Sequence, residues 1–221
     1  MKGSKAEPGP SLRAEALATA RMRFLQWGYS GTSISTIAAD LGVTKAALYY
    51  HFPDKEALFL AVFDEYLEGM AADLSALSPL FEAATPLRAA FAALSGAFLT
   101  RGSACVRMDA LAFQESPQLG EGGRLALGER YHRDLVRPLG ELFARAEALG
   151  WIRPSLPGEP SRVWLFMGLL SAFFAPGHGL QDAANRDAAA IETVAAAFAS
   201  LFLDGIAQRK QAAHGLSAGG P

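Results

Sequence analysis

Two short helical segments joined by a tight turn constrain this chain more than any other feature. They occupy the run SISTIAADLGVTKAALYYHFPDK, which begins at Ser33. Ser33 can cap a helix that ends near Leu41, and Thr44 can cap a second helix that ends near His51. Gly42 occupies the turn, where a positive φ is easiest for glycine. This spacing predicts a helix-turn-helix, a motif that places its second helix in the major groove of DNA.

The two faces of this helix pair differ in chemistry. A helical hairpin in an ordinary bundle would share the apolar inward face, which consists of Ile37, Leu41, Val43, Leu48 and Phe52. Ala38 lies where the two helix backbones must approach closely, so a small residue is needed there. It would not require the outward face, which combines short and hydrogen-bonding side chains: Thr44, Lys45, Ala46, Ala47, Tyr49, Tyr50, His51 and Lys55. Short side chains let a helix approach bases, and the others can reach phosphate oxygens. Packing of the tyrosines and capping by the histidine are the alternatives.

Lys45 and Lys55 are predicted to contact different parts of DNA. Lys55 lies in the first turn of the following helix, where the helix dipole disfavours a cation. A phosphate beside that helix end would reverse the preference. Lys45 can donate to guanine O6 and N7. We therefore predict that Lys55 contacts a phosphate and that Lys45 reads a base.

Charge is distributed unevenly along the chain. Its 20 Lys and Arg residues and 22 Asp and Glu residues give a net charge of −2, which excludes a uniformly basic nucleic-acid coat. Residues 1–55 hold 7 basic and 4 acidic residues, which give a net charge of +3. Residues 56–221 hold the other 13 basic and 18 acidic residues, which give a net charge of −5. A positive end on an acidic body indicates an anionic partner at that end, with chance asymmetry as the alternative.

The remaining sequence predicts an all-α fold of about nine helices. The periodicity continues through a helix from Asp54 past Leu74, and through helices near 86–101, 103–115, 121–149, 160–176 and 187–207, with a kink or break at Pro138. Residues 1–10 and 209–221 have the composition of disordered tails.

Composition also limits the location and the cofactors. The single cysteine, Cys105, excludes an intrachain disulfide, although a redox role for it stays open. The longest uncharged apolar run, Val163 to Pro176, has 14 residues, fewer than a membrane span needs. With no signal-peptide pattern at the N-terminus, we expect a cytoplasmic protein with no membrane partner, no cofactor and no bound metal.

At the quoted residues the chain resembles the TetR/AcrR family of bacterial transcriptional regulators. The resemblance covers residues 11–63 and rests on Phe24, Gly28-Tyr29, Thr32-Ser33-Ile34, Ile37-Ala38, Leu41-Gly42-Val43, Leu48 to Pro53, Lys55-Glu56 and Leu58. It implies a three-helix DNA-binding head at 11–56 and a helical body for ligand binding and dimerisation at 57–208. It also implies a dimer that binds a double-stranded DNA operator through its heads. The predicted DNA-contacting residues are Thr32, Ser33, Ser35, Thr44, Lys45, Ala46, Ala47, Tyr49, Tyr50, His51 and Lys55.

Two helices near the C-terminus are apolar on every side, as in VWLFMGLLSAFFA from Val163. A surface helix should have a polar face, so a second copy of the chain is the simplest cover. One large monomeric core is the alternative. Close packing of the two copies would use the small residues of these helices: Gly168, Ser171, Ala172, Ala196 and Ser200.

The apolar bulk of the body also favours a cavity for a small apolar or aromatic effector. For each aromatic residue, ordinary core packing is the alternative. Candidate pocket residues are Phe91, Leu94, Phe98, Met108, Leu111, Gln114, Tyr131, His132, Trp164, Met167 and Phe173.

An enzyme is the weaker hypothesis. Asp109, Glu115, Tyr131, His132 and Asp134 lie close in sequence, and Glu129 with His132 could form a weak metal pair, but no established catalytic motif appears. The sequence therefore predicts a ligand-responsive repressor. A structural or partner-binding bundle, or an activator of the same fold, is the alternative.

Overall fold

The computed structural model describes residues 11–82, 85–101, 108–109, 111–112, 114–155, 158–159, 161–173 and 188–206. The two predicted tails and Cys105 lie outside these ranges, and the predicted helix at 103–115 is described only in part. The described elements are helical, with no β-strand among them, which confirms the predicted fold class. The domain boundary after residue 56 stays a prediction.

The head consists of three helices and the start of a fourth: α1 (Leu12–Trp27), α2 (Ile34–Asp40), α3 (Lys45–His51) and α4 (Lys55–Leu77). The expected caps form. Ser33 and Thr36 make a capping box at α2, and Thr44 Oγ1 accepts from the amide of Ala47 at 3.3 Å. Gly42 has a φ of 66°, so the turn between α2 and α3 uses the left-handed region that favours glycine.

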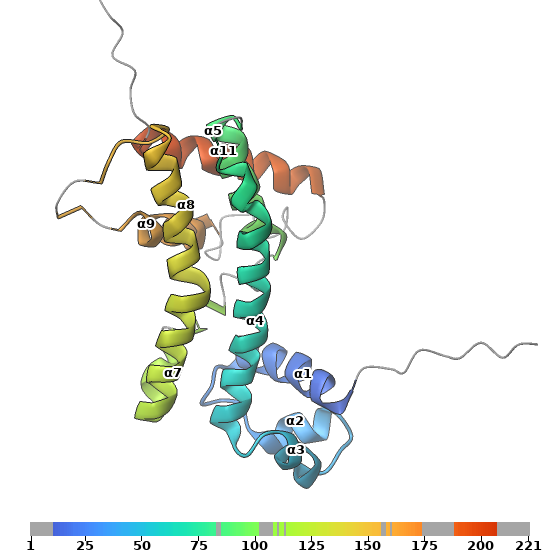
Figure 1. Cartoon of the computed structure of the whole chain (residues 1–221). Coiled ribbons are helices and arrows are strands. Elements are labelled where there is room, and N and C mark those ends of the chain that lie inside the picture. The colour runs from blue at the N-terminus through green and yellow to red at the C-terminus, as the bar shows by residue number, and fades with distance from the viewer. Residues whose placement is uncertain are drawn as a thin grey trace, which may run out of the picture.

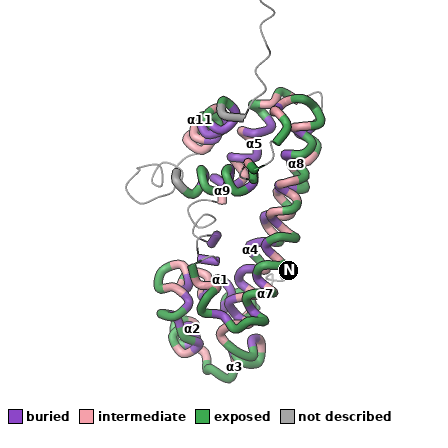
Figure 2. Tube along the Cα trace, turned by 90° about the vertical axis from the view of Figure 1, so that its left-hand side faces the viewer, coloured by how far each residue is buried: buried purple, intermediate pink, exposed green. Residues whose placement is uncertain are grey.

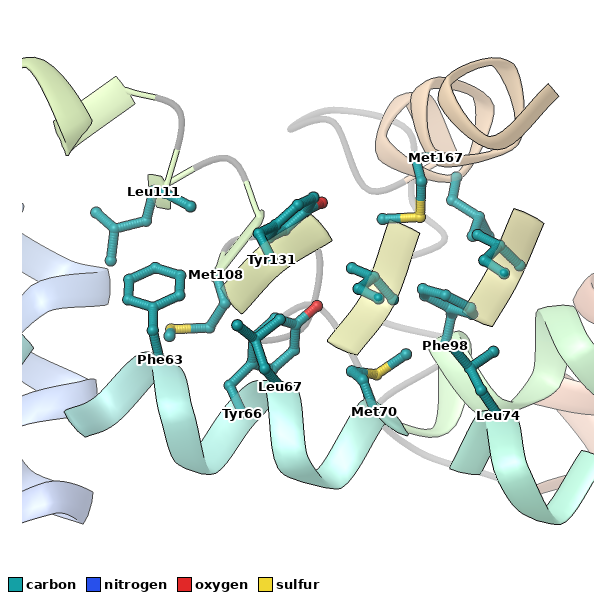
Figure 3. Packing of buried hydrophobic residues seen from close by; sticks show 14 of the residues in the cluster. Phe63, Tyr66, Leu67, Met70, Leu74, Phe98, Met108, Leu111, Tyr131 and Met167 are labelled. Atoms are coloured by element: carbon teal, nitrogen blue, oxygen red, sulfur yellow. The ribbon is translucent and has the colours of Figure 1, made fainter. Parts of the chain in front are cut away.

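Helix α4 connects the head to the body and runs along much of the molecule (Figure 1). Its 23 residues begin at Lys55, where Asp54 Oδ1 accepts from the amide of Ala57 at 2.7 Å. One face of α4 is buried along its whole length, from the head core to the body core: Leu58, Phe59, Val62, Phe63, Tyr66, Leu67, Met70 and Leu74. Figure 3 shows several of these residues packed against side chains of the body. The head and body therefore share one hydrophobic core.

The body is built from α5 (Leu87–Thr100), α7 (Glu121–Tyr131), α8 (Arg137–Ala148), α9 (Arg162–Phe173) and α11 (Ala188–Ile206). Short 3₁₀ turns lie at Ser78–Leu80 and Ser116–Gln118. Helix α7 lies beside the lower half of α4, and α8 continues beside its upper half (Figure 1). Between α7 and α8 the chain forms a π-helical segment, His132–Val136, and Pro138 lies in the first turn of α8. Helical structure continues without a gap from α7 to α8, so the predicted split at Pro138 does not occur, and a kink there stays a prediction.

An aromatic cluster fills the far end of the body. Phe166 lies with its ring centroid 5.3 Å from those of Phe198 and Phe202, and Phe143 lies 5.6 Å from Phe91. These rings come from α9, α11, α8 and α5, so they join four helices into one unit. Among the helices that the structure describes, none is long and apolar enough to cross a membrane.

Candidate nucleic-acid interface and body cavity

Helix α3 presents its outward face at one end of the molecule (Figures 1 and 2). Tyr50 is 86% exposed and Tyr49 is 49% exposed, whereas Leu48 on the inward face of α3 is fully buried. Thr44, Lys45 and Ala46 are exposed, and Ala47 and His51 are half-buried. Tyr50 makes an edge-to-face contact with the neighbouring His51 ring, 5.1 Å between centroids, yet stays exposed. Neighbouring exposed aromatic side chains are typical of a binding surface. The packing interpretation of Tyr49 and Tyr50 is therefore not favoured.

The residues before α3 divide into two groups. Ser33 is exposed at the N-cap of α2, and Ser35 is half-buried. Thr32 is only 2% exposed, and its hydroxyl donates to the carbonyl oxygen of Gly28 at 2.9 Å. The Thr32 side chain therefore closes the turn after α1, and its place in the predicted DNA-contacting set is corrected: a buried, satisfied hydroxyl is not presented to DNA.

An ion pair fixes α2 against α1. The Arg23 guanidinium donates two hydrogen bonds to the Asp40 carboxylate, at 2.6 and 2.5 Å. This interaction lowers the pKa of Asp40 and raises the pKa of Arg23. Paired, planar contacts of this kind also fix orientation, so they help to hold α3 at a set angle to the head.

Lys55 has an internal partner. Its ammonium Nζ donates to the carbonyl oxygen of Tyr29 at 3.0 Å and lies 3.9 Å from the centre of the Tyr29 ring. Burial lowers the pKa of Lys55, and the nearby Glu115 carboxylate opposes that shift. These contacts stabilise a cation at the N-terminus of α4 without a phosphate. The predicted phosphate contact of Lys55 stays a prediction. The contact with Tyr29 is a second explanation for a lysine at the N-terminus of α4.

A cavity of about 300 Å³ opens between α7 and α9, and its wall is mostly apolar. The Trp164 and Tyr131 rings lie parallel, with an angle of 9° between their planes and 6.2 Å between their centroids. Tyr131, His132 and Trp164 belong to the predicted pocket. The full lining is Ala112, Ser116, Arg124, Leu127, Gly128, Tyr131, His132, Val136 and Trp164.

Most of the other predicted pocket residues do not line this cavity. Six of them are instead buried in the hydrophobic core: Phe91, Leu94, Phe98, Met108, Leu111 and Met167. Figure 3 shows Phe98, Met108, Leu111 and Met167 in that core. Gln114 is exposed, and the side chain of Phe173 lies outside the described residues. The missed residues Arg124, Leu127 and Gly128 share one face of α7 with Tyr131, at spacings of three, four and seven, so periodicity could have found them.

A buried carboxyl group lies in the core beside α4. Asp109 is 4% exposed, and its Oδ1 accepts from the Tyr66 hydroxyl at 2.9 Å. Burial raises the pKa of Asp109 to about 7, against the opposing effect of hydrogen bonds from Tyr66 and Tyr131. The Glu115 carboxylate instead faces the head, beside Gly28. The possible catalytic set is therefore only partly brought together, because Asp109 lies beside Tyr131 whereas Glu115 faces the head. The described residues hold no group of three or more metal-binding side chains.

Helices α9 and α11 carry an exposed apolar surface. Leu201 is 67% exposed, and Trp164, Leu165 and Leu169 are each more than 40% exposed. Of the predicted interface residues, Gly168, Ser171 and Ala196 are exposed, and Ser200 is half-buried and accepts from Arg88 Nη1 at 2.7 Å. The side chain of Ala172 lies outside the described residues.

A family model described as bacterial regulatory proteins of the tetR family matches residues 16–62, which contain most of α1, all of α2 and α3, and the start of α4. The N-terminal part of the chain is therefore similar to the corresponding part of the tetR family of bacterial regulatory proteins. Among curated relatives, the HTH-type transcriptional regulator RutR of Escherichia coli K12 is 36% identical over 74 residues, which are 34% of this chain and 35% of RutR. The repressor AcnR of Corynebacterium diphtheriae is 39% identical over 59 residues, 27% of this chain and 31% of AcnR. The matches thus span about a third of each curated relative.

The resemblance of the whole chain is one of fold. The structure of AibR in complex with isovaleryl coenzyme A and operator DNA superposes with a TM-score of 0.64 at 22% identity, over 86% of this chain and 96% of AibR. The head and the helical body therefore both have counterparts in this solved structure, whereas the family model matches only residues 16–62.

Proposed function

We propose that this chain is a cytoplasmic, non-enzymatic transcriptional repressor of the tetR family that acts as a homodimer. Each head binds a half-site of a palindromic operator through α3, with Lys45 reading a base. In the DNA-competent state the two heads match successive major grooves, ~34–36 Å apart. A small apolar or aromatic effector in the body cavity favours another head spacing and so lowers DNA affinity.

The single observation that carries the proposal is the outward face of α3. Exposed Tyr49 and Tyr50 stand beside exposed Lys45 on a short helix whose inward residue, Leu48, is completely buried. A partner-binding bundle needs an exposed apolar face but no such mixture of small, aromatic and cationic groups on a helix-turn-helix. The AibR complex with operator DNA adds support from a protein of the same fold.

Fluorescence anisotropy with labelled DNA from the region flanking the gene tests the proposal. We expect salt-dependent binding to one palindromic site, and loss of discrimination at one base position in Lys45→Ala, worth ~1–3 kcal/mol. Arg137→Ala is the matched control, because Arg137 is an exposed cation on α8, in the body. No binding at low salt would favour the partner-binding bundle, and binding that increases transcription in a reconstituted assay would favour the activator.

The body cavity and the exposed face of α9 and α11 support the other two parts of the proposal. A volume of about 300 Å³ with a mostly apolar wall suits a small effector, and Tyr131 with Trp164 offers a flat aromatic surface to it. The exposed Leu165, Leu169 and Leu201 side chains suit burial against a second copy. We propose that the predicted small residues Gly168, Ser171, Ala172, Ala196 and Ser200 let the paired helices approach closely.

A further inference from the structure

The first turn of α4 makes a direct contact with the N-terminus of α7. Glu56 Oε2 accepts from the amide of Gly120, the N-cap residue of α7, at 2.8 Å. A Cβ atom on Gly123 would lie only 2.2 Å from Glu56 Oε1, so glycine is required there while the carboxylate keeps its place. The free amides and the dipole at a helix N-terminus favour such an anion. Glu56 thus connects the head end of α4 to the body.

A second contact lies beside the first. Glu115 Oε1 occupies the space 2.6 Å from where a Cβ of Gly28 would be, at the end of α1. The same carboxylate acts electrostatically on Lys55, which is bound to Tyr29. The segment from Glu115 to Gly123 therefore contacts both the C-terminal end of α1, through Glu115, and the first turn of α4, through Gly120.

Residues next to both ends of this segment line the cavity. Ala112 and Ser116 line it on either side of Glu115 in sequence, and Arg124, Leu127 and Gly128 line it after Gly123. Gly123 and Leu127 are one turn apart on α7, about 6 Å along its axis. Because the lining residues and Gly123 belong to the same helix, a shift of α7 on ligand binding would also change the position of its N-terminus relative to Glu56.

We propose that Glu56 and the segment Glu115–Gly123 are the coupling contact through which the cavity controls the head; this inference rests on the proposed function. Glu56 is a positioning residue: it touches neither effector nor DNA, and it transmits a displacement of α7 to the head. Removing its carboxylate leaves the cavity and the face of α3 in place and breaks the connection between them.

A double-mutant cycle tests the coupling without a known effector. Gly128→Trp supplies a permanent occupant of the cavity, because an added Cβ at Gly128 meets no atom within 4 Å. We expect Gly128→Trp to weaken operator binding ~5- to 150-fold in the wild-type background, the usual range of an allosteric coupling. In the Glu56→Ala background the same substitution should change affinity less than about twofold. Gly128→Leu serves as a second occupant if the tryptophan variant does not fold.

Three further variants separate coupling from general damage. Glu65→Ala, an exposed carboxylate on α4, should keep the full effect of Gly128→Trp. Glu56→Gln keeps an acceptor for the Gly120 amide and should restore part of the coupling. Gly123→Ala improves intrinsic helix propensity yet displaces the Glu56 carboxylate, so it should uncouple the sites without melting α7.

The outcomes distinguish the two proposals. If the wild-type chain binds no operator, the proposed function fails. If operator binding is normal but Gly128→Trp has no effect, or has equal effects in the wild-type and Glu56→Ala backgrounds, the coupling contact is overturned and the DNA-binding function stands.

Discussion

Replacing Asp109 by asparagine should make the chain more stable above neutral pH. The native carboxyl group keeps its proton up to a pKa of about 7, whereas the unfolded chain releases it near 3.8. Between these values the native state binds more protons than the unfolded state, so this group lowers the stability as pH rises and the loss is complete above pH 7. About 3 pKa units correspond to a loss of up to ~4 kcal/mol. Asparagine removes the titration and still offers an oxygen to the Tyr66 hydroxyl.

Urea unfolding of wild-type and Asp109→Asn protein from pH 4.5 to 8.5 measures this difference. The variant should gain stability progressively up to pH 7, and the two proteins should converge toward pH 4.5. Glu65→Gln is the control, since Glu65 is exposed on α4 and its substitution should leave the pH profile unchanged. An Asp109→Asn variant that is less stable than wild type above pH 7 would refute the reasoning, because it would mean that the buried site favours the ionised carboxylate.

Three other predictions concern the surfaces. Lys55→Ala should weaken binding equally on all DNA sequences and reduce the salt slope by roughly one if Lys55 contacts a phosphate; an unchanged slope with a lower melting temperature would assign the lysine to Tyr29 alone. Gly168→Trp should yield monomers in light scattering and lose operator affinity, because the added side chain enters open space on its own chain and obstructs a partner; Gly122→Trp, equally open but on α7, is the control that should stay dimeric. Apolar compounds that fit the cavity should raise the melting temperature. At a free compound concentration of ~100 times Kd, the free energy of unfolding should increase by ~2.7 kcal/mol, and Gly128→Trp should abolish this stabilisation.

Local chemistry made the head predictable. Ser33, Thr44 and Asp54 cap their helices through side chains only three residues from the amides they accept from. Gly42 adopts the positive φ that its place in the turn requires. Such interactions depend on neighbours in sequence, so they can be read before the fold is known. Thr32 shows the limit of such local reasoning. Its hydroxyl could bind either DNA or the nearby Gly28 carbonyl, and the sequence alone does not distinguish the two partners.

The body was predictable in class and not in detail. Its helices follow from periodicity, but the cavity depends on which face of α7 meets α9, and that is a long-range property. Leu94 and Phe98 are as apolar as any pocket residue, yet both are fully buried in the core. Lys55 was difficult for the same reason, because its partners Tyr29 and Glu115 come from distant parts of the chain.

The π-helical segment His132–Val136 gives the α7–α8 region a different tolerance to changes in chain length. A π turn holds one more residue than an α turn, and removing one residue from an α-helix rotates everything after it by about 100°. With the wide turn present, Tyr131 faces the cavity while Leu135, Leu139 and Leu142 all face the core. A one-residue deletion within 132–136 therefore has a surplus residue to absorb it, whereas the same deletion elsewhere in α7 or α8 must rotate an apolar face into water. Natural length variation in this region should concentrate at these five positions.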